Sequence, residues 1–224
     1  MKQEELDIIL EKHGKWLRDE GGERADLKGA NLSNASLRHA FLRHAFLRHA
    51  FLRHADLSGA DLRYADLGNA FLSDADLSDA DLSNADLKHA SLSNADLSNA
   101  DLKHASLSNA DLSNADLKHA DLSNADLSNA SLRHAEGLTV ICVQVDTSRR
   151  NNQITYIKEL EIWIKDGFQG TLDELKASVE QTHKDNEKLR KRYYRVIDFI
   201  LNEVGNEKIR IKIGWSKLWK NSEN

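Results

Sequence analysis

The sequence has little of what would assign it to several common classes of protein. Its 224 residues include one cysteine, Cys142, so no internal disulfide can form. Alternating apolar residues around Cys142 favour a buried structural thiol over a nucleophile. No apolar run approaches the roughly 20 residues needed to cross a bilayer, and the charged residues 1–5 contain no signal-peptide core. We therefore expect a soluble, cytoplasmic protein without membrane contact.

Charge of one sign is not in large excess either. The formal net charge is −5. Residues 1–24 carry 5 cationic and 7 acidic side chains, residues 25–135 carry 10 and 15, and residues 136–224 carry 16 and 14. The middle region is acidic and the last is slightly basic. Neither imbalance is strong enough to indicate direct binding to nucleic acid.

What the chain has in abundance is one five-residue phrase. From Ala25 to Ala135, Ala and Leu recur at every fifth position without an insertion, which gives 22 consecutive repeats by direct count. This period fits neither a helix nor a half-buried strand. Ala and the Leu two residues later suit a short extended segment with both side chains on one face, and the other three residues suit a turn. Such a chain must coil on itself with Ala and Leu inside.

These residues resemble the pentapeptide repeat proteins, a bacterial family whose motif is Ala, Asp or Asn, Leu and two variable residues. The phrase Ala110-Asp111-Leu112-Ser113-Asn114 matches that motif fully. The resemblance implies a right-handed quadrilateral β-helix with one repeat per side and about 20 residues per coil. The repeats would then form about 5.5 coils, on the order of 26 Å tall.

The ends of such a coil need caps, because they would expose backbone and apolar side chains. Residues 1–24 predict a capping helix ended by Gly21-Gly22, with His13 as a rim residue. Its apolar face comprises Leu6, Ile9, Leu10, His13, Trp16 and Leu17. We therefore divide the chain into a capping helix (1–24), a β-helix (25–135) and a C-terminal module (136–224).

The C-terminal module predicts a small α+β fold of unassigned role. Residues 138–145 and 153–157 read as strands, 160–164 as a third, and 209–213 as a segment that rejoins the sheet. A capping box at 171–174 predicts one helix, and residues 185–204 predict a second. The apolar face of the second helix comprises Leu189, Tyr193, Val196, Ile197, Ile200 and Leu201.

An enzyme in this module is one hypothesis. The polar cluster Thr182, His183, Asp185 and Asn186 lies between the two helices. The module has no second His, metal-ligand spacing or nucleophile motif. The simpler interpretation is a solvated loop with Asp185 as helix N-cap. We therefore predict no catalytic residue, no cofactor and no metal site.

The residue before each Leu should face outward and stack on the residue 20 positions later. Two neighbouring sides would then carry acidic columns: Asp56, Asp76, Asp96 and Asp116 on one, and Asp61, Asp81, Asp101 and Asp121 on the next. Such columns could imitate DNA phosphates. The resemblance implies a matching function, because some pentapeptide repeat proteins inhibit DNA gyrase as DNA mimics and others protect it from fluoroquinolones. Alternatively, these Asp side chains bind backbone amides in the turns.

Four consecutive repeats form a belt of aromatic and basic residues around the coil. The belt contains Phe41, Phe46, Phe51, Arg43, Arg48 and Arg53, and Phe71 should stack on Phe51 one coil away. Exposed Phe beside Arg indicates a protein-binding or self-association surface. Repeat duplication without a selected contact is the alternative. Later His residues recur every 15 positions, so they drift around the sides and form no metal ladder.

The sequence leaves three function classes. The first is a noncatalytic scaffold with an unidentified protein partner and a possible homodimer. The second is a DNA-mimicking regulator of a type II topoisomerase, and the third is an enzyme in the C-terminal module.

Overall fold

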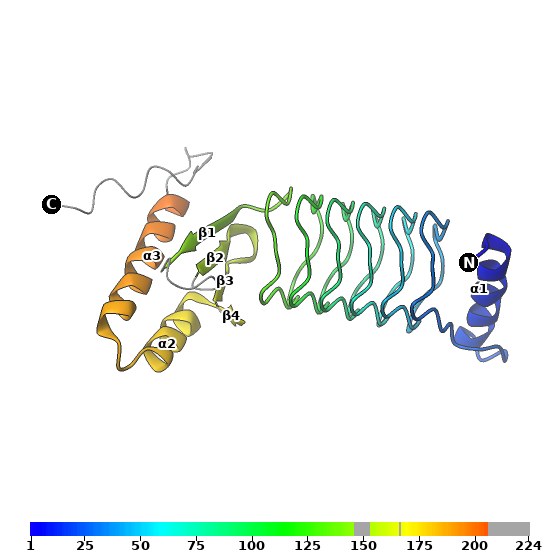
Figure 1. Ribbon diagram of the computed structural model, residues 1–224, viewed down its shortest axis with the longest axis horizontal. Helices are drawn as coiled ribbons and strands as arrows, with labels where there is room; N and C mark the ends of the chain where they lie inside the picture. The colour runs from blue at the N-terminus through cyan, green and yellow to red at the C-terminus, as the bar shows by residue number, and fades with distance from the viewer. Residues whose placement is uncertain (146–152, 166, 206–224) are drawn as a thin grey trace.

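The computed structural model describes residues 1–145, 153–165 and 167–205. Three parts follow one another along its long axis: helix α1 (Gln3–Leu17), the stack of repeats, and the C-terminal module (Figure 1). The boundaries between these three parts, at residues 24 and 135, remain predictions from the sequence.

The repeats form a β-helix with a 20-residue period. Parallel bridges join each outward residue to the one 20 positions later, from Asp26–Phe46 through Asp116–Glu136. A typical coil-to-coil pair joins Leu97 N–H to the Asp116 carbonyl at 2.8 Å and Asp116 N–H to the Ala95 carbonyl at 3.0 Å. Four repeats therefore make one coil, as the stacking prediction required.

The inward residues are the ones that the repeat predicted. Every Leu from Leu27 to Leu132 is buried, and so is each Ala except six near the ends of the stack that are half-buried: Ala30, Ala35, Ala40, Ala120, Ala130 and Ala135. Burying one Leu contributes roughly 1.5–3 kcal/mol, so this column supplies most of the hydrophobic stabilisation of the β-helix. The core depends only on the five-residue period, and the outward residues are free to vary.

The corners of the coil require left-handed backbone. In every repeat from Gly29 to His134, the residue before Ala has φ between +55° and +64°. The next residue, Ala, donates its N–H to the preceding Leu carbonyl, as in Ala100 to Leu97 at 3.1 Å. Asn, Asp, His and Gly enter this region at the lowest cost, which explains why they occupy almost all of these positions.

Helix α1 closes the first coil, but His13 is not a rim residue as predicted. Leu6 and His13 are both buried, at 1% and 0% exposure. His13 Nδ1 accepts the Ala25 N–H at 3.1 Å, so Nε2 carries the proton and donates to the Arg43 carbonyl at 3.1 Å. The imidazole therefore joins α1 to the coil through both nitrogens.

The C-terminal module is a four-stranded antiparallel sheet covered by two helices on one face (Figure 1). The strands run in the order β1-β2-β3-β4. Its elements are β1 (Val140–Gln144), β2 (Gln153–Ile157), a 3-10 turn η1 (Lys158–Leu160), β3 (Ile162–Lys165), β4 (Phe168–Gly170), α2 (Leu172–Thr182) and α3 (Glu187–Gly205). The capping box of α2 is confirmed, because Thr171 Oγ1 accepts the Glu174 N–H and Glu174 accepts the Thr171 N–H.

Several details of the predicted module were wrong. The third strand begins after the η1 turn, and β4 was not predicted at all. Asn186, not Asp185, caps α3, since its Oδ1 accepts the Leu189 N–H at 3.0 Å. Leu201 is 41% exposed although it was expected on the apolar face. The predicted segment 209–213 lies outside the described residues.

The module also closes the last coil. Ile157 and Ile164 lie on the sheet face opposite the helices and join the Leu core of the repeats. Gln169 of β4 adds a polar contact, since its Oε1 accepts the Leu127 N–H at 2.6 Å and its Nε2 donates to the Ala125 carbonyl at 2.7 Å. The sheet is therefore buried on both faces and serves as a second cap.

Candidate interaction surfaces

The outward residues form four columns, one on each side of the β-helix. Bridges at 20-residue spacing place the two predicted acidic columns on separate sides, Asp56 to Asp116 and Asp61 to Asp121. The same bridges place Phe51 and Phe71 on a third side, between Asn31 and Ser91. We call this column the aromatic side. It contains Asn31, Phe51, Phe71, Ser91, Asp111 and Ser131.

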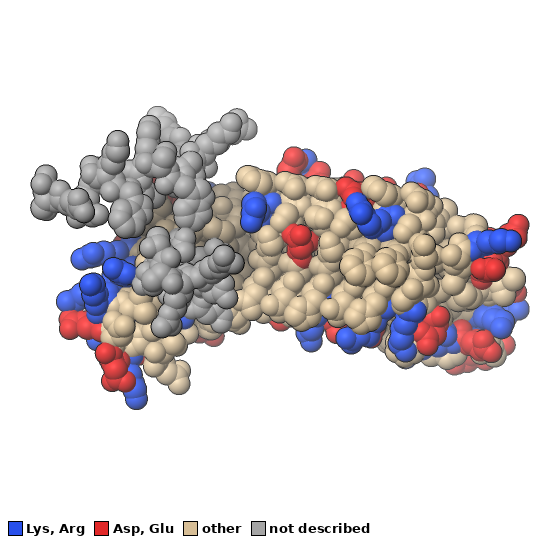
Figure 2. Space-filling view, in the orientation of Figure 1, with Lys and Arg blue, Asp and Glu red and all other residues tan. Residues whose placement is uncertain are grey.

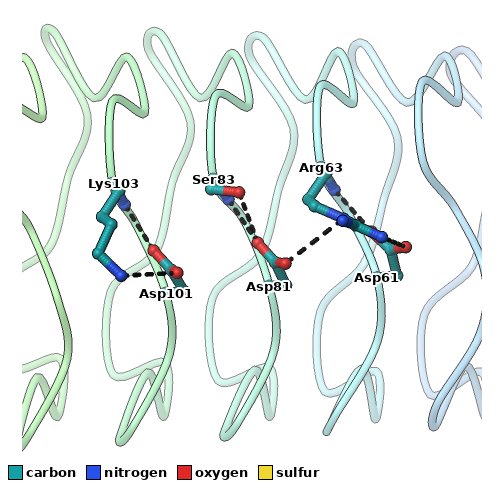
Figure 3. A network of polar contacts seen from close by, with 6 residues as sticks. All are labelled: Asp61, Arg63, Asp81, Ser83, Asp101 and Lys103. Atoms are coloured by element: carbon teal, nitrogen blue, oxygen red, sulfur yellow. Dashed lines mark hydrogen bonds and ion pairs between the residues drawn. The ribbon is translucent and has the colours of Figure 1, made fainter.

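The acidic side chains hold the turns beside them. Oδ1 of Asp76, Asp81 and Asp96 accepts the backbone N–H two residues later, at 2.9–3.0 Å. The Ser hydroxyl at the same position donates to that oxygen at 2.6–2.7 Å. Figure 3 shows this arrangement at Asp81 and Ser83. One carboxylate oxygen of each is thus committed to local structure, as the alternative interpretation required.

Cations bridge successive acidic residues along the columns. Arg63 contacts Asp61 at 2.6 Å and Asp81 at 3.4 Å. Lys103 contacts Asp101 at 3.0 Å and Asp121 at 3.1 Å. Figure 2 shows a β-helix face that is mostly uncharged, with acidic and basic side chains lying mainly along its edges. The Asp61–Asp121 column therefore presents paired charges more than a continuous negative strip, whereas on the other column a cation, Lys118, contacts Asp116 and Glu136 at its last coil.

These contacts stabilise the ionised carboxylates. Hydrogen bonds from the Ser123 side chain and backbone, then from Lys103, lower the pKa of Asp121 to about 2. Hydrogen bonds from the Lys118 side chain and backbone lower the pKa of Asp116. Burial opposes ionisation of Asp61, but hydrogen bonds from Arg63 outweigh it and lower the pKa of that carboxyl. Near neutral pH, all three residues are charged.

The aromatic residues of the belt have three different environments. The Phe51 and Phe71 rings stack at 4.9 Å and 8°, as predicted, and are 45% and 42% exposed. Phe41 is 66% exposed on another side. Phe46 is half-buried beneath two cations, with the Arg24 guanidinium carbon 3.7 Å and Lys28 Nζ 4.1 Å from its ring centroid. Only the Phe51–Phe71 pair forms a contiguous apolar surface.

The arginines of the belt are likewise separated. Arg53 contacts Asp74 at 3.4 Å and Arg48 contacts Asp66 at 4.0 Å. Arg43 is half-buried near α1, and its Nε is buried without a hydrogen-bond partner in the part of the chain that the structure describes. The predicted belt is therefore not one surface.

The recurring His residues have a conformational explanation that the sequence interpretation missed. All eight His residues between His39 and His134 occupy corners with positive φ. The signal was available in the sequence, because the other residues at these corners are Asn, Asp, Gly and one Tyr. Within residues 1–145, 153–165 and 167–205, no group of three or more His, Cys, Asp or Glu could hold a metal ion.

The polar cluster of the module is dispersed. His183 stacks on Tyr193 at 5.0 Å, whereas Asn186 caps α3. A pocket at the start of α3 is lined by Asn186, Lys188, Leu189 and Arg192, and His183 is not among its residues. This pocket therefore does not include the predicted His183.

Cys142 fits its prediction only in part. The residue is exposed, although a buried thiol was expected, but burial raises the pKa of the thiol itself. It lies on edge strand β1 opposite Thr155, and its Sγ is 3.2 Å from the Thr155 hydroxyl. Alternation along the strand places Cys142 on the same sheet face as Ile157, but at the edge of the sheet, where neighbours are fewer.

Among the described residues, no helix is long and apolar enough to cross a membrane.

The family model for pentapeptide repeats matches residues 23–53, 55–94 and 95–133, in eight copies. No curated protein sequence matches the chain significantly.

Solved structures of repeat proteins are similar to part of the chain. A pentapeptide repeat protein from the Arabidopsis thaliana thylakoid lumen is 34% identical over 45% of this chain and 70% of its own, with a TM-score of 0.44. HetL, involved in heterocyst differentiation regulation in Nostoc sp. strain PCC 7120, is 36% identical over 51% of this chain and 62% of its own, with a TM-score of 0.38. The fluoroquinolone resistance protein QnrB1 is 24% identical over 53% and 66%, with a TM-score of 0.26.

Proposed function

Because this chain belongs to the pentapeptide repeat proteins, we propose that it is a noncatalytic scaffold whose right-handed β-helix presents a protein-binding surface. The observation that carries the proposal is the Phe51–Phe71 pair. These two rings are stacked, parallel and more than 40% exposed on a rigid coil.

The exposure of these rings is costly unless a partner covers them. Most other outward positions of the repeats carry Asp or Ser, which contact water or their own turns. Transfer of an aromatic ring from water into an apolar contact lowers the free energy by roughly 25 cal/mol per Å² of apolar surface buried. Two rings held in place by the coil also lose little conformational freedom on binding. The pair therefore has the properties of a preorganised binding hot spot.

Site-specific photo-crosslinking tests this proposal. Benzoylphenylalanine would replace Phe71 in the full chain, expressed in its host, and a matched chain would carry it at Asp96 on an acidic column. We expect a protein adduct from position 71 and none from position 96. Equal adduct yields at the two positions, or no adduct from either, would refute the proposed binding surface.

A second candidate function is regulation of a type II topoisomerase by DNA mimicry. The observation that favours it is the register of eight Asp residues in two columns. The cations bridging the Asp61–Asp121 column and the commitment of carboxylate oxygens to turns on both columns argue against it. A gyrase assay tests this second function. If it is right, the purified protein changes DNA supercoiling by gyrase or drug-stabilised DNA cleavage. No effect on either activity would eliminate it.

A further inference from the structure

We propose that the aromatic side binds a second copy of this chain, in antiparallel orientation, so that Phe51 of one copy packs against Phe71 of the other. This inference rests on the proposed function, because it requires the Phe51–Phe71 pair to be a protein-binding surface. It goes further by naming the partner and the geometry.

The first argument is the distribution of charge among the four sides. Each of the other three columns carries four Asp residues at outward positions, whereas the aromatic side carries one, Asp111. A two-fold dimer brings the same surface of both copies together. Through any of the other sides, columns of carboxylates would meet one another. The aromatic side is the one that can meet itself with the least repulsion between like charges.

The second argument is that hydroxyl groups follow the rings along this side. The Ser73 hydroxyl lies 2.9 Å from that of Ser91 and 3.0 Å from that of Ser93. In the proposed dimer Ser91 of one copy lies opposite Asn31 of the other, because both are one coil away from the Phe51–Phe71 pair. A hydroxyl both donates and accepts hydrogen bonds, so it is complementary to an amide side chain. Apolar rings continued by uncharged polar groups suit the centre of an interface.

The antiparallel orientation follows from the residues beside the rings. A parallel dimer with its two-fold axis along the aromatic side would place Asp111 opposite Asp111. In an antiparallel dimer centred between Phe51 and Phe71, each residue of the coil that carries Phe51 lies opposite the residue 20 positions later in the other copy. This dimer therefore places His54 of one copy opposite Asp74 of the other, because these corner residues are 20 positions apart. Asp74 also contacts Arg53 and Asn94 of its own chain, which fixes its position.

Analytical ultracentrifugation of the full chain tests the proposal. We expect a concentration-dependent dimer, and we expect the double substitution Phe51→Asp and Phe71→Asp to weaken it at least about 100-fold. The matched control is Phe41→Asp, which makes the same change at a more exposed ring on another side and should leave the dissociation constant unchanged. At a concentration low enough for the parent to be monomeric, circular dichroism should show the same spectrum and a similar thermal midpoint for all three proteins.

A parent chain that stays monomeric up to about 200 µM would overturn the proposal, because two central hot spots should support at least micromolar affinity. So would a double variant that dimerises like the parent. If the parent is monomeric while position 71 still crosslinks to a different protein, the second-copy inference fails and the proposed function stands. A crosslinked adduct of twice the 25.3 kDa chain mass supports both.

Spin labels determine the orientation. A label at Arg133→Cys, in a chain with Cys142→Ser, lies 3.5 coils from the centre of the proposed dimer. The two labels of an antiparallel dimer should then be roughly 34 Å apart along the coil axis. In a parallel dimer both labels lie at the same height, and only the width of the interface, about 10 Å, separates them. Arg133 is exposed, so the label can be accommodated. A distance near the shorter value would contradict the antiparallel arrangement.

Discussion

Both ends of the repeat stack have backbone N–H and carbonyl groups with no further coil to pair with. A single helix, α1, closes the first end, and the four-stranded sheet of the C-terminal module closes the other. At the first coil, the Gln3 side chain accepts the Ser36 N–H at 3.3 Å and donates to the Ser36 carbonyl at 3.1 Å. At the last coil, Gln169 makes the equivalent pair of bonds to Leu127 N–H and the Ala125 carbonyl, at 2.6 and 2.7 Å. Each amide side chain takes the place of a backbone peptide from a missing coil.

The difference between the ends lies in what surrounds each amide. Gln3 is exposed on α1, so water can replace its bonds. Gln169 is half-buried on a sheet whose Ile157 and Ile164 enter the Leu core. The same device should therefore contribute more at the C-terminal end, because a buried unsatisfied backbone group costs about 1–3 kcal/mol and an exposed one costs little. We infer that the free energy contributed by each capping amide depends on how completely its surroundings exclude water.

The largest effect is expected from a charge in the apolar C-terminal contact. Ile157→Asp would bury a carboxylate between the sheet and the last coil, where Ile157 is fully buried. We expect a loss of at least about 4 kcal/mol in the free energy of unfolding of the module, measured by urea denaturation with tryptophan fluorescence in a chain where Trp163 is kept and Trp16, Trp215 and Trp219 are replaced by Phe. Lys158→Asp, the same new residue one position on and exposed, is the control. Equal stability of the two variants would show that the sheet does not close the coil.

The second-largest effect is expected from loss of the Gln169 side-chain amide. Gln169→Leu keeps the size of the side chain but leaves Leu127 N–H and the Ala125 carbonyl without partners. We expect a loss of about 2–4 kcal/mol at this end, seen as hydrogen exchange of the Leu127 amide that is at least about 30-fold faster. Gln181→Leu, an exposed position on α2, should leave this rate unchanged. Unaltered Leu127 protection in Gln169→Leu would remove the peptide-replacement role.

The pattern of the repeats predicted the core, because an Ala–Leu pair every five residues specifies its own burial locally. The stacking of Phe51 on Phe71 followed from the same period. The caps could not be predicted to this depth. The bond from Gln169 to Leu127 joins residues 42 positions apart, and no periodic signal marks a single side chain that replaces a peptide.

Burial at the ends also depends on fit between elements. His13 lies on the apolar face of its helix, as predicted, but the sequence could not show that both its nitrogens meet backbone groups of the coil. Asp185 and Asn186 are both good N-cap residues, so local preference could not separate them. Two roles were open from the sequence for Asp at the outward positions, and the structure places one carboxylate oxygen of each of Asp76, Asp81 and Asp96 on a turn amide.

A third prediction concerns pH at the N-terminal end. Burial lowers the pKa of His13, and the nearby Arg24 and His44 act in the same direction, while the bond to the Arg43 carbonyl opposes them. Folding therefore favours neutral His13. Its contribution is fully present above the ordinary His pKa of 6.5 and is lost as pH falls through the lower pKa of the folded state.

Urea midpoints between pH 7.5 and 5 test this sign. The parent should lose stability as pH falls, and His13→Asn should be about 1–3 kcal/mol less stable at pH 7.5 with a weaker pH dependence. Part of the dependence should remain, because burial also lowers the pKa of His44. His89→Asn, at an exposed corner, is the control and should keep the parent profile. An unchanged profile in His13→Asn would exclude His13 as the source.

The smallest effect is expected from the exposed amide, and it decides whether water exclusion is the reason for the difference between the ends. Gln3→Leu removes the equivalent pair of hydrogen bonds to Ser36, and with them the exposed bond from Gln3 to Asp7, but the Ser36 N–H and carbonyl can bond to water instead. We expect a loss of about 0.5–1 kcal/mol in urea denaturation, and hydrogen exchange of the Ser36 amide only a few-fold faster. Gln181→Leu again serves as the control. If Gln3→Leu cost as much as Gln169→Leu, the two ends would be equivalent and the apolar C-terminal sheet would not strengthen its amide.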